Sequence, residues 1–175
     1  MSKHCYYFVE GECEEALINA LKREPCQIMP GRVKVWNVID KILPDSILRT
    51  IQPGSIVVFM FDTDVQQTGN LEKNIQKLKK YAGKVVVVFL PQVMNLEDEL
   101  KRCTDVKNIT ELTKSKSKSD FKRDFCHLKD CRQALIIHKF DIGKMWTQPL
   151  PGEFGNFSAY TRNLNQILIK PGKQQ

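Results

Sequence analysis

Acidic side chains follow two separate apolar runs of this sequence, at the point where each run ends. Glu10 comes directly after CYYFV at 5–9, and Asp62 and Asp64 come directly after SIVVFMF at 55–61. Carboxylate oxygens are the hard ligands that Mg²⁺ prefers, and this ion usually takes only one or two of them from the protein. The pattern favours a metal site, although acids at such positions can also solvate a loop and cap the next helix.

Further acids in the chain could either bind a metal or stabilise the start of a helix. Glu97 follows a later apolar run, KVVVVFL, and is the candidate for an additional metal ligand, with Asp98 and Glu99 as substitutes. A structural role stays open for all three, because Asn95 can cap a helix and the first turn of a helix favours negative charge. The structural role is favoured for three acids that follow Glu10 in the chain: Glu12, Glu14 and Glu15.

The segment KSKSKSDFKR at 114–123 is the clearest basic segment. Its alternate lysines would project together if the chain there is extended, and the serines between them can donate hydrogen bonds to phosphates. A solvated flexible loop is the alternative interpretation. The candidate nucleic-acid-binding residues are Lys114, Lys116, Lys118, Lys122 and Arg123.

The charge of the chain is unevenly distributed. The net charge is +7, but residues 1–100 hold 12 Lys/Arg against 13 Asp/Glu, whereas residues 101–175 hold 15 against 7. This asymmetry suits a polyanion that lies on a basic surface while carboxylates hold a metal against it. Basic surfaces also occur for solubility alone, so charge by itself does not decide the partner.

Other reactive side chains give weaker signals. The six cysteines form no CxxC pair, and we interpret them as reduced thiols. Cys126, His127 and Cys131 are close enough in sequence to suggest zinc, but no second ligand pair is apparent, so a helix with partly buried thiols is favoured. His4 and His138, like His127, are isolated from the acids, and no GxSxG occurs. Metal-bound hydroxide is therefore the better nucleophile hypothesis.

The elements that must position these residues alternate along the chain. Periodicity predicts strands at 5–9, 33–39, 55–61 and 84–90, the last ended by Pro91, and helices at 12–23, 44–50, 70–82 and 96–103. This order predicts an α/β domain with a mostly parallel sheet of about four strands flanked by helices. In such sheets ligands gather at the carboxyl ends of the strands, where the acids lie.

The pattern changes after the eighth element. We expect one domain over 1–148, with a core at 5–103 and a basic helical extension at 104–148 that carries Phe121 and Phe125. The run CRQALIIHKF reads as either helix or strand. The segment 149–175, rich in Pro, Gly and Asn, is predicted to be an extended surface tail whose last few residues are disordered.

The acid pattern resembles the Toprim fold. The resemblance covers about residues 5–103 and rests on FVEGECEEA followed about fifty residues later by VVFMFDTDV. It is most similar to the small Toprim nucleases of the OLD and RloB-like groups, which are linked to phage defence. The resemblance implies that Glu10, Asp62 and Asp64 bind magnesium, with Glu97 as a further ligand, and that a lysine outside the acidic motifs acts at the phosphate. No GxxxxGK[ST] occurs, which departs from the long OLD proteins.

These patterns together predict a Mg²⁺- or Mn²⁺-dependent nuclease that cleaves DNA or RNA. Its catalytic residues would be Glu10, Asp62, Asp64 and either Lys116 or Lys118. A non-catalytic nucleic-acid-binding or partner-binding module is the main alternative. Primer synthesis or strand passage ranks last, because 175 residues are few for the extra domains that those reactions use. A homodimer and a partner protein of a defence system both stay open.

The expected location is cytoplasmic, without membrane association. The N-terminus lacks a basic segment followed by a long apolar stretch. The longest apolar runs are far shorter than the ~20 residues needed to span a bilayer.

Overall fold

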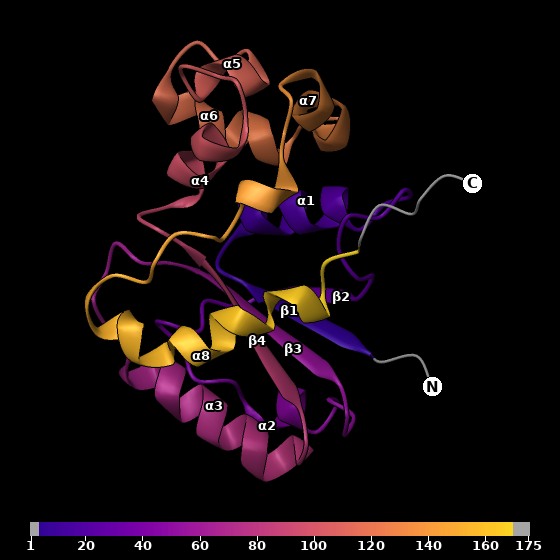
Figure 1. Cartoon of the computed structure of the whole chain (residues 1–175), viewed down its shortest axis with the longest axis vertical. Coiled ribbons are helices and arrows are strands. Elements are labelled where there is room, and N and C mark those ends of the chain that lie inside the picture. The colour runs from indigo at the N-terminus through magenta and orange to yellow at the C-terminus, as the bar shows by residue number, and fades with distance from the viewer. Residues whose placement is uncertain (1–3, 170–175) are drawn as a thin grey trace.

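The computed structural model describes residues 4–169 and begins with four repeats of strand and helix (Figure 1). The order is β1 Cys5–Val9, α1 Glu12–Leu21, β2 Arg32–Val35, α2 Asp45–Leu48, β3 Ile56–Asp62, α3 Gly69–Ala82, β4 Val86–Gln92 and α4 Leu96–Cys103. All four strands are parallel. The predicted α/β class, with a four-stranded parallel sheet flanked by helices, is confirmed.

The strand order β2-β1-β3-β4 places β1 and β3 side by side at the centre of the sheet. Both are almost continuous apolar runs, which is typical of parallel strands that are covered on both faces. Val9 at the end of β1 pairs with Met60, two residues before Asp62. The carboxyl ends of β1 and β3 therefore finish at the same edge of the sheet, where the loops that carry the acids begin.

Alternate side chains of the strands enter two cores, one on each face of the sheet. Tyr7 and Val58 lie in the core shared with α1, α4 and the helices within 110–137. Phe8 and Phe59 lie in the opposite core, which α2 and α3 cover. Figure 1 shows the first group of helices above the sheet and α2 and α3 below it.

The basic extension is helical, as predicted. It consists of α5 Thr110–Thr113, α6 Lys118–Cys126 and α7 Cys131–Ile137, so the run CRQALIIHKF begins as a helix. Phe121 and Phe125 are fully buried and hold α6 against the α1 side of the sheet. This packing is what places the basic side chains of α6 above the carboxyl ends of the strands.

The alternate lysines do not lie along an extended segment. Lys114 ends α5 in the left-handed region at φ +59°, and Lys118 is already the first residue of α6. The Ser117 hydroxyl accepts a hydrogen bond from the Asp120 N–H, which caps the start of α6. Helix capping therefore takes precedence over the alternation of lysine and serine, and the lysines are distributed over different elements.

Two strand boundaries differ from prediction. The strand expected at 33–39 ends at Val35, because the Asn37 side chain accepts a hydrogen bond from the Ile39 N–H and turns the chain. Pro91 lies inside β4 and does not end it. Because β4 is at the edge of the sheet, a residue without an N–H costs no ladder hydrogen bond on the outer side.

The segment after Pro149 is not the extended tail that composition predicted. It forms the 3₁₀ helices η2 Gly152–Phe157 and η3 Arg162–Gln166, with α8 Ser158–Thr161 between them, after the earlier 3₁₀ helix η1 Ile142–Lys144. Three aromatic residues cause the difference: Phe154 is fully buried against Phe61, and Phe157 and Tyr160 pack on Phe89. The prediction of disorder for the last few residues falls on 170–175, outside the described residues.

The C-terminal segment also covers the outer edge of the sheet. The Asn163 side-chain amide donates a hydrogen bond of 2.7 Å to the Val87 carbonyl of β4. An uncovered strand edge is a template for association with other chains, so this contact protects the sheet. Within residues 4–169 no helix has both the length and the apolar character to cross a membrane.

Replacement of Phe154 by Ala tests this packing. Because its ring is fully buried and stacks on Phe61 at 5.5 Å between centroids, we expect the variant to lose about 3–4 kcal/mol of unfolding free energy in urea denaturation. Asn156→Ala, an exposed position in the same 3₁₀ helix, is the control and should change stability little. A Phe154→Ala variant as stable as the wild type would show that the segment does not pack on the sheet in solution.

Candidate functional site

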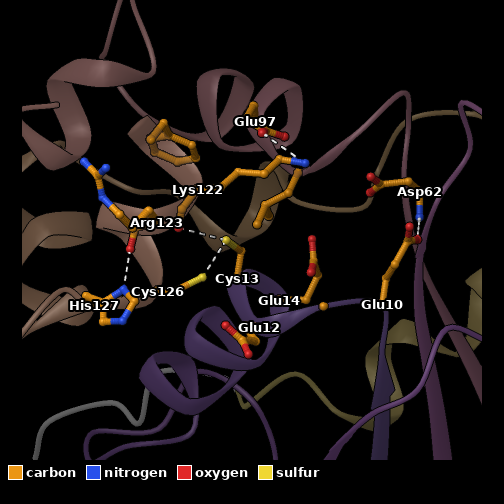
Figure 2. A pocket seen from close by; sticks show the side chains of 13 residues that line it. Glu10, Glu12, Cys13, Glu14, Asp62, Glu97, Lys122, Arg123, Cys126 and His127 are labelled. Carbon is orange, nitrogen blue, oxygen red and sulfur yellow. Dashed lines mark hydrogen bonds and ion pairs between the residues drawn. The ribbon is translucent and has the colours of Figure 1, made fainter. Parts of the chain in front are cut away.

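Glu10 and Asp62 lie side by side at the carboxyl edge of the sheet (Figure 2). The Asp62 N–H donates a hydrogen bond of 2.9 Å to Glu10 Oε2. This contact follows from the register, since Glu10 is the first residue after β1 and Asp62 ends the neighbouring strand. The structure therefore brings together two of the acids that the sequence singled out, from positions 52 residues apart.

These two acids border a pocket of about 500 Å³ that four parts of the chain enclose. The first turn of α1, the end of β3, the start of α4 and one side of α6 provide the walls. The side chains labelled in Figure 2 are Glu10, Glu12, Cys13, Glu14, Asp62, Glu97, Lys122, Arg123, Cys126 and His127. Carboxylates thus converge on one end of the pocket, and basic side chains line its α6 wall.

Glu14 is a member of this site that the sequence interpretation assigned only to a helix start. Its side chain is 7% exposed, and burial raises the pKa of its carboxyl, to which the charge of Glu10 adds. Gly11 leaves room for it, because a Cβ there would come within 3.1 Å of the Glu14 carboxylate. The available signal was the helical stripe at 14, 17, 18 and 21, in which Glu14 occupies a position facing the core.

Asp62 has the most perturbed carboxyl in the site. Burial, as the largest cause, and then the charges of Glu10, Glu14, Asp64 and Glu97, in that order, together raise its pKa to about 8. Its Oδ1 atom is buried without a hydrogen-bond partner among the described residues. Asp62 is therefore a carboxylate without a compensating donor or cation on one of its two oxygens.

Burial also raises the pKa of Glu10, only partly offset by the hydrogen bond from the Asp62 N–H. The charge of Asp64 adds to the increase. Asp64 itself is exposed and does not line the pocket. The structure thus places Asp64 close enough to act on the two central acids through its charge, but outside the cavity that they border.

Lys122 is the lysine that the fold brings to the acids. Its Nζ lies 3.6 Å from Glu97 Oε1, and Figure 2 shows the side chain reaching across the pocket toward α4. The charge of Glu97 raises the pKa of Lys122, and the charges of Asp62 and Glu14 contribute. Lys122 therefore remains an ammonium group that faces the acid cluster.

The other basic candidates either lie outside the acid pocket or are paired with acids of α6. Lys114 and Lys116 are exposed residues between α5 and α6, and neither lines the acid pocket. Lys118 lines a second pocket on the other side of Glu97. Arg123 does line the acid pocket, but its guanidinium pairs with Asp120 and Asp124 at 3.0 and 2.9 Å.

The two substitutes for Glu97 point away from the acid pocket. Glu99 is fully buried, where it pairs with Arg102 and accepts hydrogen bonds from the backbone N–H groups of Val93 and Trp146. These contacts give Glu99 a structural role. Asp98 lines the second pocket.

The cysteines and histidine of the pocket form their own contacts. Cys126 Sγ lies 2.8 Å from Cys13 Sγ on α1. The sequence did not indicate this contact. The His127 ring Nδ1 lies 2.7 Å from the Arg123 carbonyl. Among the described residues, neither Cys126 nor His127 forms a group of metal ligands with Cys131, which is buried in α7.

The acid pocket suits a hard divalent cation in the type of its donors. The donors are carboxylate oxygens, burial and then the neighbouring acids raise their pKa values, and Asp62 Oδ1 has no hydrogen-bond partner among residues 4–169. In the part of the chain that the structure describes, no three His, Cys, Asp or Glu side chains stand close enough together to hold a metal ion as they are placed. The residues therefore fit a cation in donor type and charge, but not in the spacing that the described side chains have.

No family model, curated protein or solved structure matches the chain. Function must therefore be inferred from the geometry and electrostatics of the site.

Replacement of Asp62 by Asn tests the burial of charge. The folded-state pKa of Asp62 is about 8 against an ordinary 3.8, so ionisation opposes folding increasingly as pH rises from about 4 to 8. We compare the unfolding free energy of the variant with that of the wild type, without divalent metal, at pH 5 and at pH 8.5. The difference in favour of the variant should be larger at pH 8.5 by at least ~1 kcal/mol, or about 2–4 °C in Tm. Thermal unfolding monitored by circular dichroism in EDTA measures this gain.

Asp64→Asn is the matched control, because Asp64 is exposed and its replacement should change Tm little at either pH. A stability difference between Asp62→Asn and wild type that is the same at both pH values would show that Asp62 ionises normally.

Proposed function

We propose that the chain is a divalent-metal-dependent nuclease that hydrolyses phosphodiester bonds of DNA or RNA. One observation carries this proposal: two strand-end carboxylates, Glu10 and Asp62, lie side by side in a pocket whose opposite wall presents the Lys122 ammonium group. Carboxylates that hold Mg²⁺ or Mn²⁺ next to a cation that attracts phosphate are the parts that metal-assisted phosphodiester cleavage requires.

Glu10 and Asp62 are the proposed primary metal ligands, with Glu97, Glu14 and Asp64 as the acids available to complete the set. A bound divalent cation would lower the pKa of a coordinated water and polarise a phosphoryl oxygen. Asp62 contributes an oxygen that has no hydrogen-bond partner in the described part of the chain, and Glu10 is oriented by the hydrogen bond from the Asp62 N–H. Orientation by the backbone keeps the two carboxylates at the same edge before any cation binds.

Lys122 takes the role that the sequence interpretation gave to Lys116 or Lys118. It is the lysine of that basic segment that lines the acid pocket, and its pairing with Glu97 holds it there. A phosphate oxygen in the pocket would compete with Glu97 for this ammonium group. Lys122 would then offset the negative charge that develops as the phosphodiester bond breaks.

Three broader statements belong to the same proposal. Acids at the ends of adjacent parallel strands are compatible with the Toprim resemblance carried by Glu10, Asp62 and Asp64. A cytoplasmic location and a role in phage defence rest on the sequence expectations and on that resemblance.

A cleavage assay tests the proposed function. Plasmid, single-stranded DNA and RNA are incubated with the protein in Mg²⁺, Mn²⁺ or EDTA, and the products are separated on gels. We expect cleavage only with metal, a loss of at least ~100-fold in rate for Glu10→Gln and Asp62→Asn, and a loss of about 10–100-fold for Lys122→Ala. Lys73→Ala, an exposed position on α3 across the sheet, should cleave as the wild type does.

A binding readout separates lost metal from lost folding. Mg²⁺ should raise the Tm of the wild type, because a ligand that binds only the folded state stabilises it. The same addition should leave the Tm of Glu10→Gln unchanged. An Asp62→Asn variant that cleaves at the wild-type rate would refute the assignment.

A non-catalytic nucleic-acid-binding module is the second candidate. It is favoured by the finding that, among residues 4–169, the acids are not already gathered into a group that could hold a metal. In that case the acid variants should bind nucleic acid as the wild type does, with an affinity that falls steeply as salt rises.

A further inference from the structure

A second pocket, of about 460 Å³, lies on the other side of Glu97 from the acid cluster. Lys101 of α4, Lys107 of the loop after α4 and Lys118 of α6 line it, together with Asn95, Asp98 and Asn108. Three separate segments of the chain thus contribute one lysine each. We call this cavity the lysine pocket.

The lysine pocket lies next to the acid pocket, about one helical turn away along both α4 and α6. Glu97 lines both cavities. Lys101 follows Glu97 by four residues on α4, and Lys118 precedes Lys122 by four residues on α6, so each pair lies on one face of its helix. Four residues of helix rise about 6 Å. This step is comparable to the spacing of successive phosphates along a nucleic-acid strand.

The lysine pocket carries uncompensated positive charge. Among the described ion pairs, none involves Lys101, Lys107 or Lys118. Of the two acids in its wall, Glu97 already pairs with Lys122, which leaves Asp98 against three ammonium groups. An anion in this cavity would therefore meet a net attraction.

We propose that the lysine pocket binds the phosphate next to the one that is cleaved. This assignment rests on the proposed function and names the substrate as a polynucleotide strand that contacts both cavities. The acid cluster alone would repel such a strand, because its side chains are acids whose negative charges already oppose one another. The three lysines supply the attraction that holds the strand against those carboxylates.

Binding of a fluorescent single-stranded oligonucleotide in EDTA tests this proposal without cleavage. By anisotropy, the double variant Lys101→Ala/Lys107→Ala should bind at least ~10-fold more weakly than wild type, with a slope of log affinity against log salt that is less steep by about 1–2. The control Lys73→Ala/Lys79→Ala removes the same charge from exposed positions on α3 and should bind as the wild type does.

Each outcome has a distinct meaning. If the double variant binds with the affinity and salt slope of the wild type, the proposal that the lysine pocket binds phosphate is refuted. The same holds if the wild type does not bind the oligonucleotide. A wild type that binds through these lysines but never cleaves would refute the nuclease and leave the pocket established.

A separate observation concerns the thiols of the acid pocket. Cys13 of α1 and Cys126 of α6 lie with their Sγ atoms 2.8 Å apart, and Cys13 Sγ also donates to the Lys122 carbonyl at 3.3 Å. Cys126 is partly exposed and Cys13 is buried, and both line the acid pocket (Figure 2). This places two cysteines that are 113 residues apart in direct contact beside the lysine that faces the acids.

We infer that Cys13 and Cys126 are a disulfide-forming pair for a low-molecular-weight disulfide oxidant. The Cys126 thiolate attacks one sulfur of the oxidant, which forms a mixed disulfide and releases one thiol. Cys13, after losing its proton, attacks the Cys126 sulfur and releases the second thiol. Two thiols of the protein are oxidised and the oxidant is reduced to two thiols. The product links α1 covalently to α6, one turn beyond Lys122.

Oxidation of the full chain with glutathione disulfide, followed by alkylation of remaining thiols and peptide mass mapping, tests this pair. We expect a Cys13–Cys126 cross-linked peptide that dithiothreitol removes. Cys13→Ser should abolish the cross-link and leave Cys126 as a glutathione adduct, whereas Cys26→Ser, at a thiol away from the pocket, should retain it. Oxidation that modifies the wild type without linking Cys13 to Cys126 would overturn the inference.

Discussion

The parallel register of β1 and β3 is the constraint on which the site depends. Val9 pairs with Met60, so the residues that follow both strands emerge at one edge of the sheet. The hydrogen bond from the Asp62 N–H to Glu10 then holds two carboxylates together. The apolar runs that make both strands are buried on both faces, so this arrangement is supported by the most densely packed part of the molecule.

Burial of like charge is the consequence of that register. Glu10, Glu14 and Asp62 all have raised pKa values, because burial and their mutual repulsion disfavour ionisation. Such an arrangement opposes folding unless something else compensates for it, and perturbed carboxyls of this kind are typical of functional sites. The extension supplies part of the compensation through Lys122, which Phe121 and Phe125 position by anchoring α6 in the core.

Local sequence patterns predicted part of the site, whereas contacts between distant segments could not be predicted. Glu10 and Asp62 could be identified because strand ends are visible as apolar runs that stop at an acid. Glu14 was assigned to a helix start, although its place on the buried stripe of α1 was readable. That Lys122, and not Lys116 or Lys118, lies beside the acids was not readable, because it depends on where α6 begins and on how α6 is rotated against α4.

The amino-acid sequence by itself determined the four strand–helix repeats, the parallel sheet and the edge at which the acids meet, since these follow from local periodicity and from the rules of parallel sheets. Only the tertiary structure decided the rest. It brought Cys13 into contact with Cys126, turned Glu99 into a buried structural group and packed Phe154 against the sheet. Each of these contacts joins segments far apart in the chain, where packing geometry decides which side chains meet.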